Sequence, residues 1–165
     1  MTGVQTCALP ISHVPVTAVL ELKAAHGIKG CDIESITVAS SEKMLSHHNI
    51  TEPQDITMAQ YSTPFCVALA FYRDPRDPTQ FSDASIADAD IRALCRKVTL
   101  ESDHELVKDN SLATRMTVRL KNGKAITHVT QEFPGMPRRP LTDAELREKY
   151  DRVITGIAQI GRAHV

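Results

Sequence analysis

His13 combines a residue type and a position that could support acid–base chemistry. It stands directly before a stretch with helical periodicity that begins at Val14. The free backbone N–H groups at a helix N-terminus favour anions, and an imidazole beside them could bind a carboxylate or move a proton near neutral pH. The alternative is a surface histidine without a chemical role, and local sequence alone favours that alternative.

A second group of polar side chains precedes an apolar stretch. Tyr61, Ser62 and Thr63 stand just before the run that starts at Pro64. Their hydroxyls could donate to a substrate anion, or they could cap the helix that follows, and capping is the favoured reading on physical grounds. The pair Arg138-Arg139 could clamp a carboxylate, although such pairs are more often solvated.

The adjacent pair His47-His48 suggests a metal site, but neighbouring residues on a strand or helix point apart and rarely bind one ion together. We therefore expect a solvated loop, or a loop folded over a neighbouring domain, and no metal site. The sequence has no glycine-rich phosphate loop, no Gly-x-Ser-x-Gly turn and no His-Glu-x-x-His helix. No self-sufficient catalytic motif is present.

The elements that must position these residues follow from periodicity, caps and turns. Helical signals predict four helices: over 14–26, with Gly27 as its C-terminal cap, over 64–72, from the Asp88 cap to Cys95, and over 142–159. Capping-box spacing at Thr57 and the pair Thr63-Pro64 are start signals ahead of the second helix. The region 41–55 is polar and is predicted to be irregular. Strands are predicted over 33–39, 97–101, 114–120 and 125–131.

The last two strands flank Asn122-Gly123, which predicts a β-hairpin with a type I′ turn. The close spacing of the last three strands indicates antiparallel pairing. Together the elements predict an α+β two-layer sandwich: a sheet of about four mainly antiparallel strands with helices on one face, plus a C-terminal helix.

Composition places the 165-residue chain among soluble globular domains. It is 42% hydrophobic, has no apolar run long enough to cross a membrane, and has 19 basic against 20 acidic residues with no basic stripe. We therefore expect neither nucleic acid nor a membrane as a partner. Cys31, Cys66 and Cys95 are scattered without a close pair, which indicates reduced thiols in the cytoplasm rather than a zinc site.

The two ends of the chain resemble one translated sequencing adapter. Residues 5–11 can be encoded by CAGACGTGTGCTCTTCCGATC, and the reverse complement, read one base in, encodes residues 160–165. We therefore expect residues 1–11 and 160–165 to be non-native. The native part is then about 12–159, an internal piece of a longer protein.

Five segments in series carry a resemblance to a known family. They are residues 13–18, 32–38, 59–65, the hairpin around 122–123, and 135–150. In this order they resemble the C-terminal part of the MmgE/PrpD family. The first resembles the family's His-x-x-Ile-Asp-Ala helix start, the second its Asp-Ile-x-x-Ile-x-Val strand, and the third its Ala-Gln-Phe-Ser-x-Pro-Tyr motif. The fourth matches its Asn-Gly hairpin, and the fifth resembles its Gly-x-Pro…Pro-Leu-Ser-Asp-x-Glu-Leu ending.

The resemblance implies an α+β lid domain at 12–141 and a helix at 142–159 that returns toward a helical domain outside this sequence. That family includes 2-methylcitrate dehydratase, cis-aconitate decarboxylase and iminodisuccinate epimerase. The resemblance implies a lyase that needs neither an organic cofactor nor a metal, and that is dimeric and cytoplasmic. The cleft between its lid and its helical domain is expected to bind a small di- or tricarboxylate. His13 is then a catalytic residue, and Gln60, Tyr61 and Ser62 contact the substrate.

Two alternatives stay open beside this expectation. Where many family members have a glycine after the buried helix, this sequence has Arg73-Asp74-Pro75, so the reaction could be decarboxylation or epimerisation rather than dehydration. The other alternative is a non-catalytic α+β module for dimerisation or anion binding. The fragment alone is expected to be inactive, because the principal acid–base residues belong to the helical domain.

Overall fold

The computed structural model describes residues 10–162, and describes the side chains of residues 12–154. Most of the two adapter-like segments, 1–11 and 160–165, therefore lies outside the described residues and side chains. Four strands form one sheet: β1 (Ile33–Ser40), β2 (Val98–Ser102), β3 (Thr114–Leu120) and β4 (Ala125–Thr130). Their order is β2-β1-β3-β4, with β1 and β2 parallel and the other two pairs antiparallel. The expected four-stranded sheet is confirmed, with mixed strand directions. The expected antiparallel pairing of the last three strands is wrong for β2, which pairs in parallel with β1 and does not neighbour β3.

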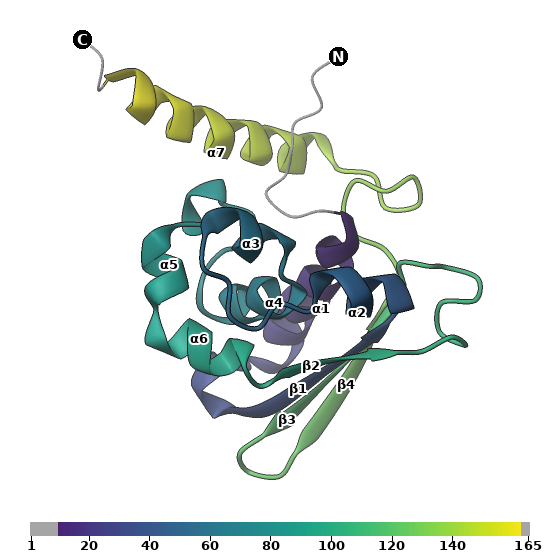
Figure 1. Ribbon diagram of the computed structural model, residues 1–165. Helices are drawn as coiled ribbons and strands as arrows, with labels where there is room; N and C mark the ends of the chain where they lie inside the picture. Colours follow the sequence, from purple (N-terminus) through teal and green to yellow (C-terminus); the bar gives the residue numbers. More distant parts are fainter. Residues whose placement is uncertain (1–9, 163–165) are drawn as a thin grey trace.

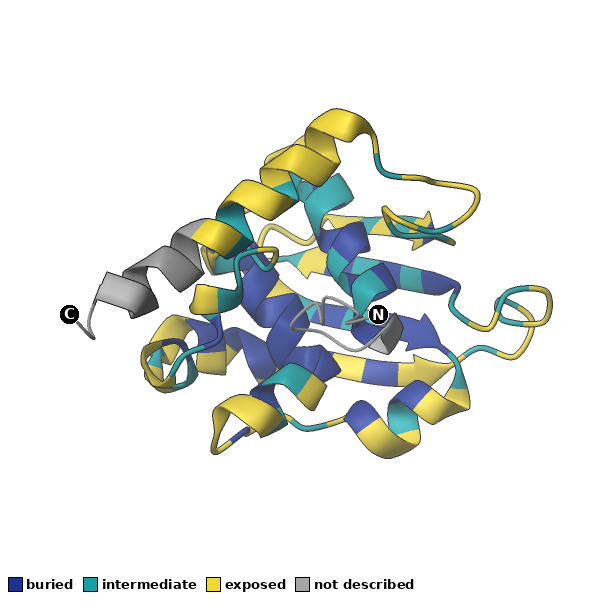
Figure 2. Cartoon of the chain, turned by 90° about the horizontal axis from the view of Figure 1, so that it is seen from above, coloured by how far each residue is buried: buried dark blue, intermediate teal, exposed yellow. Residues whose placement is uncertain are grey.

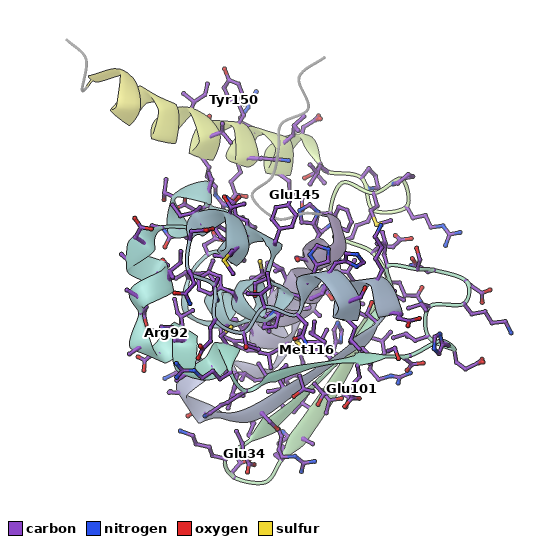
Figure 3. The ribbon with its side chains drawn as sticks, in the orientation of Figure 1. Glu34, Arg92, Glu101, Met116, Glu145 and Tyr150 are labelled. Atoms are coloured by element: carbon purple, nitrogen blue, oxygen red, sulfur yellow. The ribbon has the colours of Figure 1, made fainter. Side chains whose placement is uncertain are left out.

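Apolar and polar side chains alternate along the strands, and this alternation decides which face of the sheet packs on the core. Ile36 and Val38 are fully buried, whereas Thr37 between them is only half-buried. Figure 3 shows Met116 of β3 between the sheet and the helices, while Glu34 and Glu101 lie on the other side of the sheet. One face of the sheet thus packs on the core and the other carries polar groups, as the two-layer expectation requires.

The helices cover one face of the sheet (Figure 1). They are α1 (Pro10–His26), α2 (Glu42–His48), α3 (Ile56–Tyr61), α4 (Thr63–Tyr72), α5 (Asp83–Ala87) and α6 (Ala89–Cys95), with 3₁₀ turns at Gly30–Asp32 and Pro78–Gln80. Residues 63–71 of α4 are all buried, so this helix is the centre of the core, as its apolar sequence predicts (Figure 2). Lys23 of α1 reaches the C-terminal end of α4, where it donates to the Ala70 and Phe71 carbonyls at 2.8 and 3.2 Å.

Three local expectations are wrong in detail. α1 begins at Pro10, so His13 lies in the first turn of the helix rather than before it. The region 41–55 contains the helix α2, whose buried Met44 and His48 stand one helical turn apart. Asp55, not Thr57, caps α3 by accepting a hydrogen bond from the Met58 N–H at 2.7 Å.

The predicted hairpin is confirmed, but its turn is not type I′. Within the turn only Gly123 has a positive φ, of 84°, and no non-glycine residue among those described does. Leu120 N–H donates to the Lys124 carbonyl at 2.8 Å, which encloses the three residues 121–123. A three-residue loop with glycine in the left-handed position needs only one residue at positive φ.

The helix α7 (Asp143–Arg162) lies across the helical layer, away from the sheet (Figure 1). It starts with the predicted capping box: Glu145 accepts from the Thr142 N–H at 2.8 Å, and Thr142 Oγ1 accepts from the Glu145 N–H at 3.2 Å. Asp74 forms an ion pair with Arg152 of α7 at 3.4 Å. None of the helices within residues 10–162 combines the length and apolar character needed to cross a membrane.

Candidate functional site

The first turns of α1 and α4 meet through two buried hydroxyl groups. Ser12 Oγ lies 3.4 Å from Thr63 Oγ1, and both residues are fully buried. His13 follows Ser12, and Ser62 comes just before Thr63, so this contact brings together the two segments that were singled out in the sequence. They are fifty residues apart in the chain.

His13 is half-buried and packs against the loop that follows β4. Its ring meets the edge of Phe133 with a centroid separation of 4.7 Å and an interplanar angle of 68°. Its carbonyl accepts a hydrogen bond from Thr17 Oγ1 at 2.8 Å. Phe133 was not singled out in the sequence, because nothing local connects it to a residue 120 positions away.

Ser62 is the N-cap of α4, as expected on physical grounds. Its Oγ accepts a hydrogen bond from the Phe65 N–H at 2.9 Å and donates to the Ile50 carbonyl. The residue is fully buried. Both bonds of the hydroxyl hold the protein together, so a substrate contact from Ser62 Oγ requires one of them to be exchanged.

Gln60 and Tyr61 end the helix α3 and stand beside His48. Tyr61 is 45% exposed, and Gln60 is half-buried. The Tyr61 carbonyl accepts a hydrogen bond from His48 Nδ1 at 2.8 Å, and the two rings lie nearly parallel, 6.1 Å apart with an angle of 10°. Of the predicted substrate contacts, Tyr61 has the most accessible side chain.

The two adjacent histidines have different surroundings. His48 is buried, whereas His47 is exposed and its Nδ1 lies 2.6 Å from Ser46 Oγ. Within the described residues no group of three or more His, Cys, Asp or Glu side chains is placed to hold a metal ion. The spacing Met44-His48, one helical turn, was the sequence signal that could have identified His48 as buried.

A charged network fixes the loop that carries Phe133. The carboxylate of Glu21 on α1 accepts from His128 Nε2, Thr130 Oγ1 and Arg139 Nη1, each at 2.8 Å; we call these four residues the Glu21 network. Arg139, a predicted carboxylate clamp, is thus engaged with a carboxylate of this chain. Arg138 has an 87% exposed side chain, 3.9 Å from Glu132.

Electrostatics keep Glu21 ionised. Burial alone would raise its pKa, but the hydrogen bonds from His128, Thr130 and Arg139 and the charge of Arg139 outweigh burial and leave the pKa lowered. The network lines an open depression of about 490 Å³. Glu21 lies two helical turns after His13 on α1, so the network connects the second half of this helix to β4.

The segment Arg73-Asp74-Pro75 has a structural role at the other end of α4. Asp74 accepts from Arg76 Nε at 2.9 Å and pairs with Arg152 of α7. Burial raises the pKa of Asp74, but the hydrogen bonds from Arg76 and the charge of Arg152 lower it. The net effect is a lowered pKa. This segment therefore contributes an ion pair between the rest of the fold and α7.

One comparison with known proteins identifies the family of this chain. A search of curated proteins found no match to this chain. The family model described as the MmgE/PrpD C-terminal domain matches residues 7–165, which include His13, the 60–62 segment, the hairpin and α7. The chain belongs to the MmgE/PrpD family, of which it is a C-terminal domain.

Proposed function

We propose that this domain is the lid of a lyase of the 2-methylcitrate dehydratase type, which removes a proton next to a carboxylate of a small di- or tricarboxylic acid and eliminates water. The family membership supports an enzyme of lyase type. The observation that carries the proposal to this site is the contact of Ser12 with Thr63, which gathers His13 and the 60–62 segment at one end of α1 and α4.

In this proposal His13 is the catalytic residue of the lid, binding a substrate carboxylate or transferring a proton. A half-buried imidazole with one edge against Phe133 has a defined orientation, which general acid–base catalysis requires. Gln60 and the exposed Tyr61 supply donors to the substrate. For Ser62, the backbone at the start of α4 is the better-placed contact, because its hydroxyl caps the helix.

The other wall of the cleft is proposed to be a helical domain of the intact protein. A tricarboxylate needs cationic and donor groups on several sides, and closing a lid excludes water and strengthens those contacts. We propose a cytoplasmic homodimer, with no organic cofactor or metal in the reaction. A second candidate is a decarboxylase or epimerase of the same family, because the sequence has Arg73-Asp74-Pro75 where many members have a glycine.

Substitution of His13 in the intact protein tests the proposal. We expect His13→Ala to lower kcat/KM on 2-methylcitrate by about 100-fold or more, the usual contribution of a general acid–base group, while the thermal midpoint changes little. His26→Ala, at the exposed end of the same helix, is the matched control. Equal kinetics for wild type and His13→Ala would return His13 to the role of a surface histidine.

The two-domain part of the proposal has its own test. A purified protein of residues 12–159 should not turn over 2-methylcitrate, since the principal acid–base groups lie elsewhere. Measurable dehydration by this fragment would contradict the need for a second domain. Turnover of cis-aconitate or iminodisuccinate by the intact protein, without dehydration, would support the second candidate.

A further inference from the structure

His48 is a buried titratable group that the proposed reaction does not use. It ends α2, one helical turn after Met44, and is 6% exposed. A buried histidine needs a hydrogen-bond partner for its polar atoms, since an unpaired buried group is costly. Its partner therefore indicates its role.

The partner of His48 is the last residue of α3. Nδ1 of His48 lies 2.8 Å from the Tyr61 carbonyl oxygen, and because a carbonyl can only accept, Nδ1 must carry the hydrogen. The carbonyls in the last turn of a helix have no partner inside the helix. His48 thus binds the end of a six-residue helix that is too short to be stable by itself.

The rings of His48 and Tyr61 make a second contact between the two residues. They are nearly parallel, 6.1 Å apart, and Tyr61 remains 45% exposed. One side of the tyrosine ring is therefore backed by a buried side chain while the rest stays open. A single histidine fixes both the backbone and the ring of Tyr61.

The segment after His48 is attached to the same place. The Ile50 carbonyl accepts from Ser62 Oγ, and the Thr51 carbonyl accepts from Cys95 Sγ at 3.2 Å. Residues 48–51 are thus bound to the junction of α3 and α4 and to α6. These hydrogen bonds fix the backbone next to His48, so His48 can in turn hold Tyr61.

We propose that His48 is a positioning residue for Tyr61. Its Nδ1–H bond and ring contact hold the tyrosine in the orientation in which it meets a substrate carboxylate. What Tyr61 binds rests on the proposed function, whereas the orientation of Tyr61 does not. The two parts can therefore be tested separately.

The first test measures orientation by NMR in the full 165-residue chain, without ligand. Two-bond ¹H–¹⁵N correlations should show His48 with its proton on Nδ1. His48→Ala should shift the Tyr61 carbonyl ¹³C and ring resonances, whereas His48→Asn, whose amide can replace the Nδ1–H donor, should restore the carbonyl shift. A neutral His48 ring with its proton on Nε2, or a Tyr61 carbonyl unchanged in His48→Ala, would overturn the proposal.

The second test adds tricarballylate, an unreactive tricarboxylate, to the intact protein, which supplies the other wall of the proposed cleft, and follows the Tyr61 ring signals. His48→Ala should weaken binding about tenfold, the effect of one lost hydrogen bond, and His48→Asn should recover most of it. His47→Ala, at the exposed neighbour, should bind as the wild type does. Equal affinity for wild type and His48→Ala would count against positioning. No binding to the wild type would contradict the substrate role of Tyr61, and the first test would still decide positioning.

Discussion

Cys31 is exposed, whereas Cys66 and Cys95 are buried, and none of these three forms a disulfide. Burial raises the pKa of the Cys95 thiol to about 12, and its Sγ donates to the Thr51 carbonyl. The reactive species of a thiol is the thiolate. At the residue scale, the described cysteines therefore divide into one open to reagents and two with structural roles.

Thiol labelling should show this division. In a Cys7→Ser background near pH 8, we expect Cys31 to react with iodoacetamide at least about a hundredfold faster than Cys95, because burial suppresses both access and ionisation. Mass spectrometry of peptides at timed intervals measures the rates. Denaturant should abolish the difference, and fast labelling of Cys95 in the native chain would contradict its burial.

Single residues of the site were only partly predictable. Ser62 could be identified as a cap because capping depends on residues three positions apart, and the Phe65 N–H bond is such a contact. Phe133 and the Tyr61 partner of His48 could not, because those contacts join segments that only the fold brings together. Sequence chemistry thus indicated the residues with functional groups but not the residues that orient them.

At the element scale, local signals placed the hairpin, α4 and the start of α7, since Asn-Gly, continuous apolar character and a capping box act within a few residues. α2 was missed because its sequence is polar and its burial comes from packing. α5 was missed because it has only five residues, capped by Ser82. The parallel pairing of β1 with β2 depends on distant segments and has no local signal.

The Glu21 network joins α1, β4 and the following loop, and its contribution should depend on pH. The pKa of Glu21 is lowered from 4.5, so its stabilisation is present above about pH 4.5 and is lost as pH falls through the lower pKa of the folded state. We expect the difference in unfolding free energy between wild type and Glu21→Gln to shrink below that pH. Urea titrations across the acid range measure it.

The control for this prediction removes a carboxylate elsewhere. Glu34→Gln lies on the outer face of the sheet, away from the network (Figure 3). If Glu21→Gln shows the same difference from wild type at pH 3 as at pH 7, the network does not stabilise the ionised carboxylate. Arg139→Gln should reproduce the Glu21→Gln result in part.

At the scale of the whole molecule, the described side chains of α7, residues 143–154, make few contacts with the α+β body. Arg152 pairs with Asp74 and with Glu148 of its own helix. Leu146, Tyr150 and Ile154 repeat every four residues and are 56%, 64% and 41% exposed, and Tyr150 points away from the body (Figure 3). We therefore expect the body to unfold with little dependence on the 143–154 part of this helix.

Arg152→Ala should loosen α7 alone. We expect amide hydrogen exchange across residues 143–154 to rise by up to about fivefold, because a partly exposed ion pair contributes about 1 kcal/mol or less. The thermal midpoint of the body should stay within error. Arg147→Ala, an exposed substitution on the same helix, is the control. Unchanged exchange in Arg152→Ala would show that Asp74 does not hold α7.

The order β2-β1-β3-β4 has a consequence for how the chain assembles. β1 is central, yet its two neighbours are made much later: Ile36 pairs with Val98 about sixty residues on, and with Val118 about eighty residues on. During synthesis both edges of β1 therefore remain unpaired until the five helices α2 to α6 have emerged from the ribosome. Such long-range pairing slows folding and leaves an open strand edge for that time, so the newborn domain is a candidate client for chaperones.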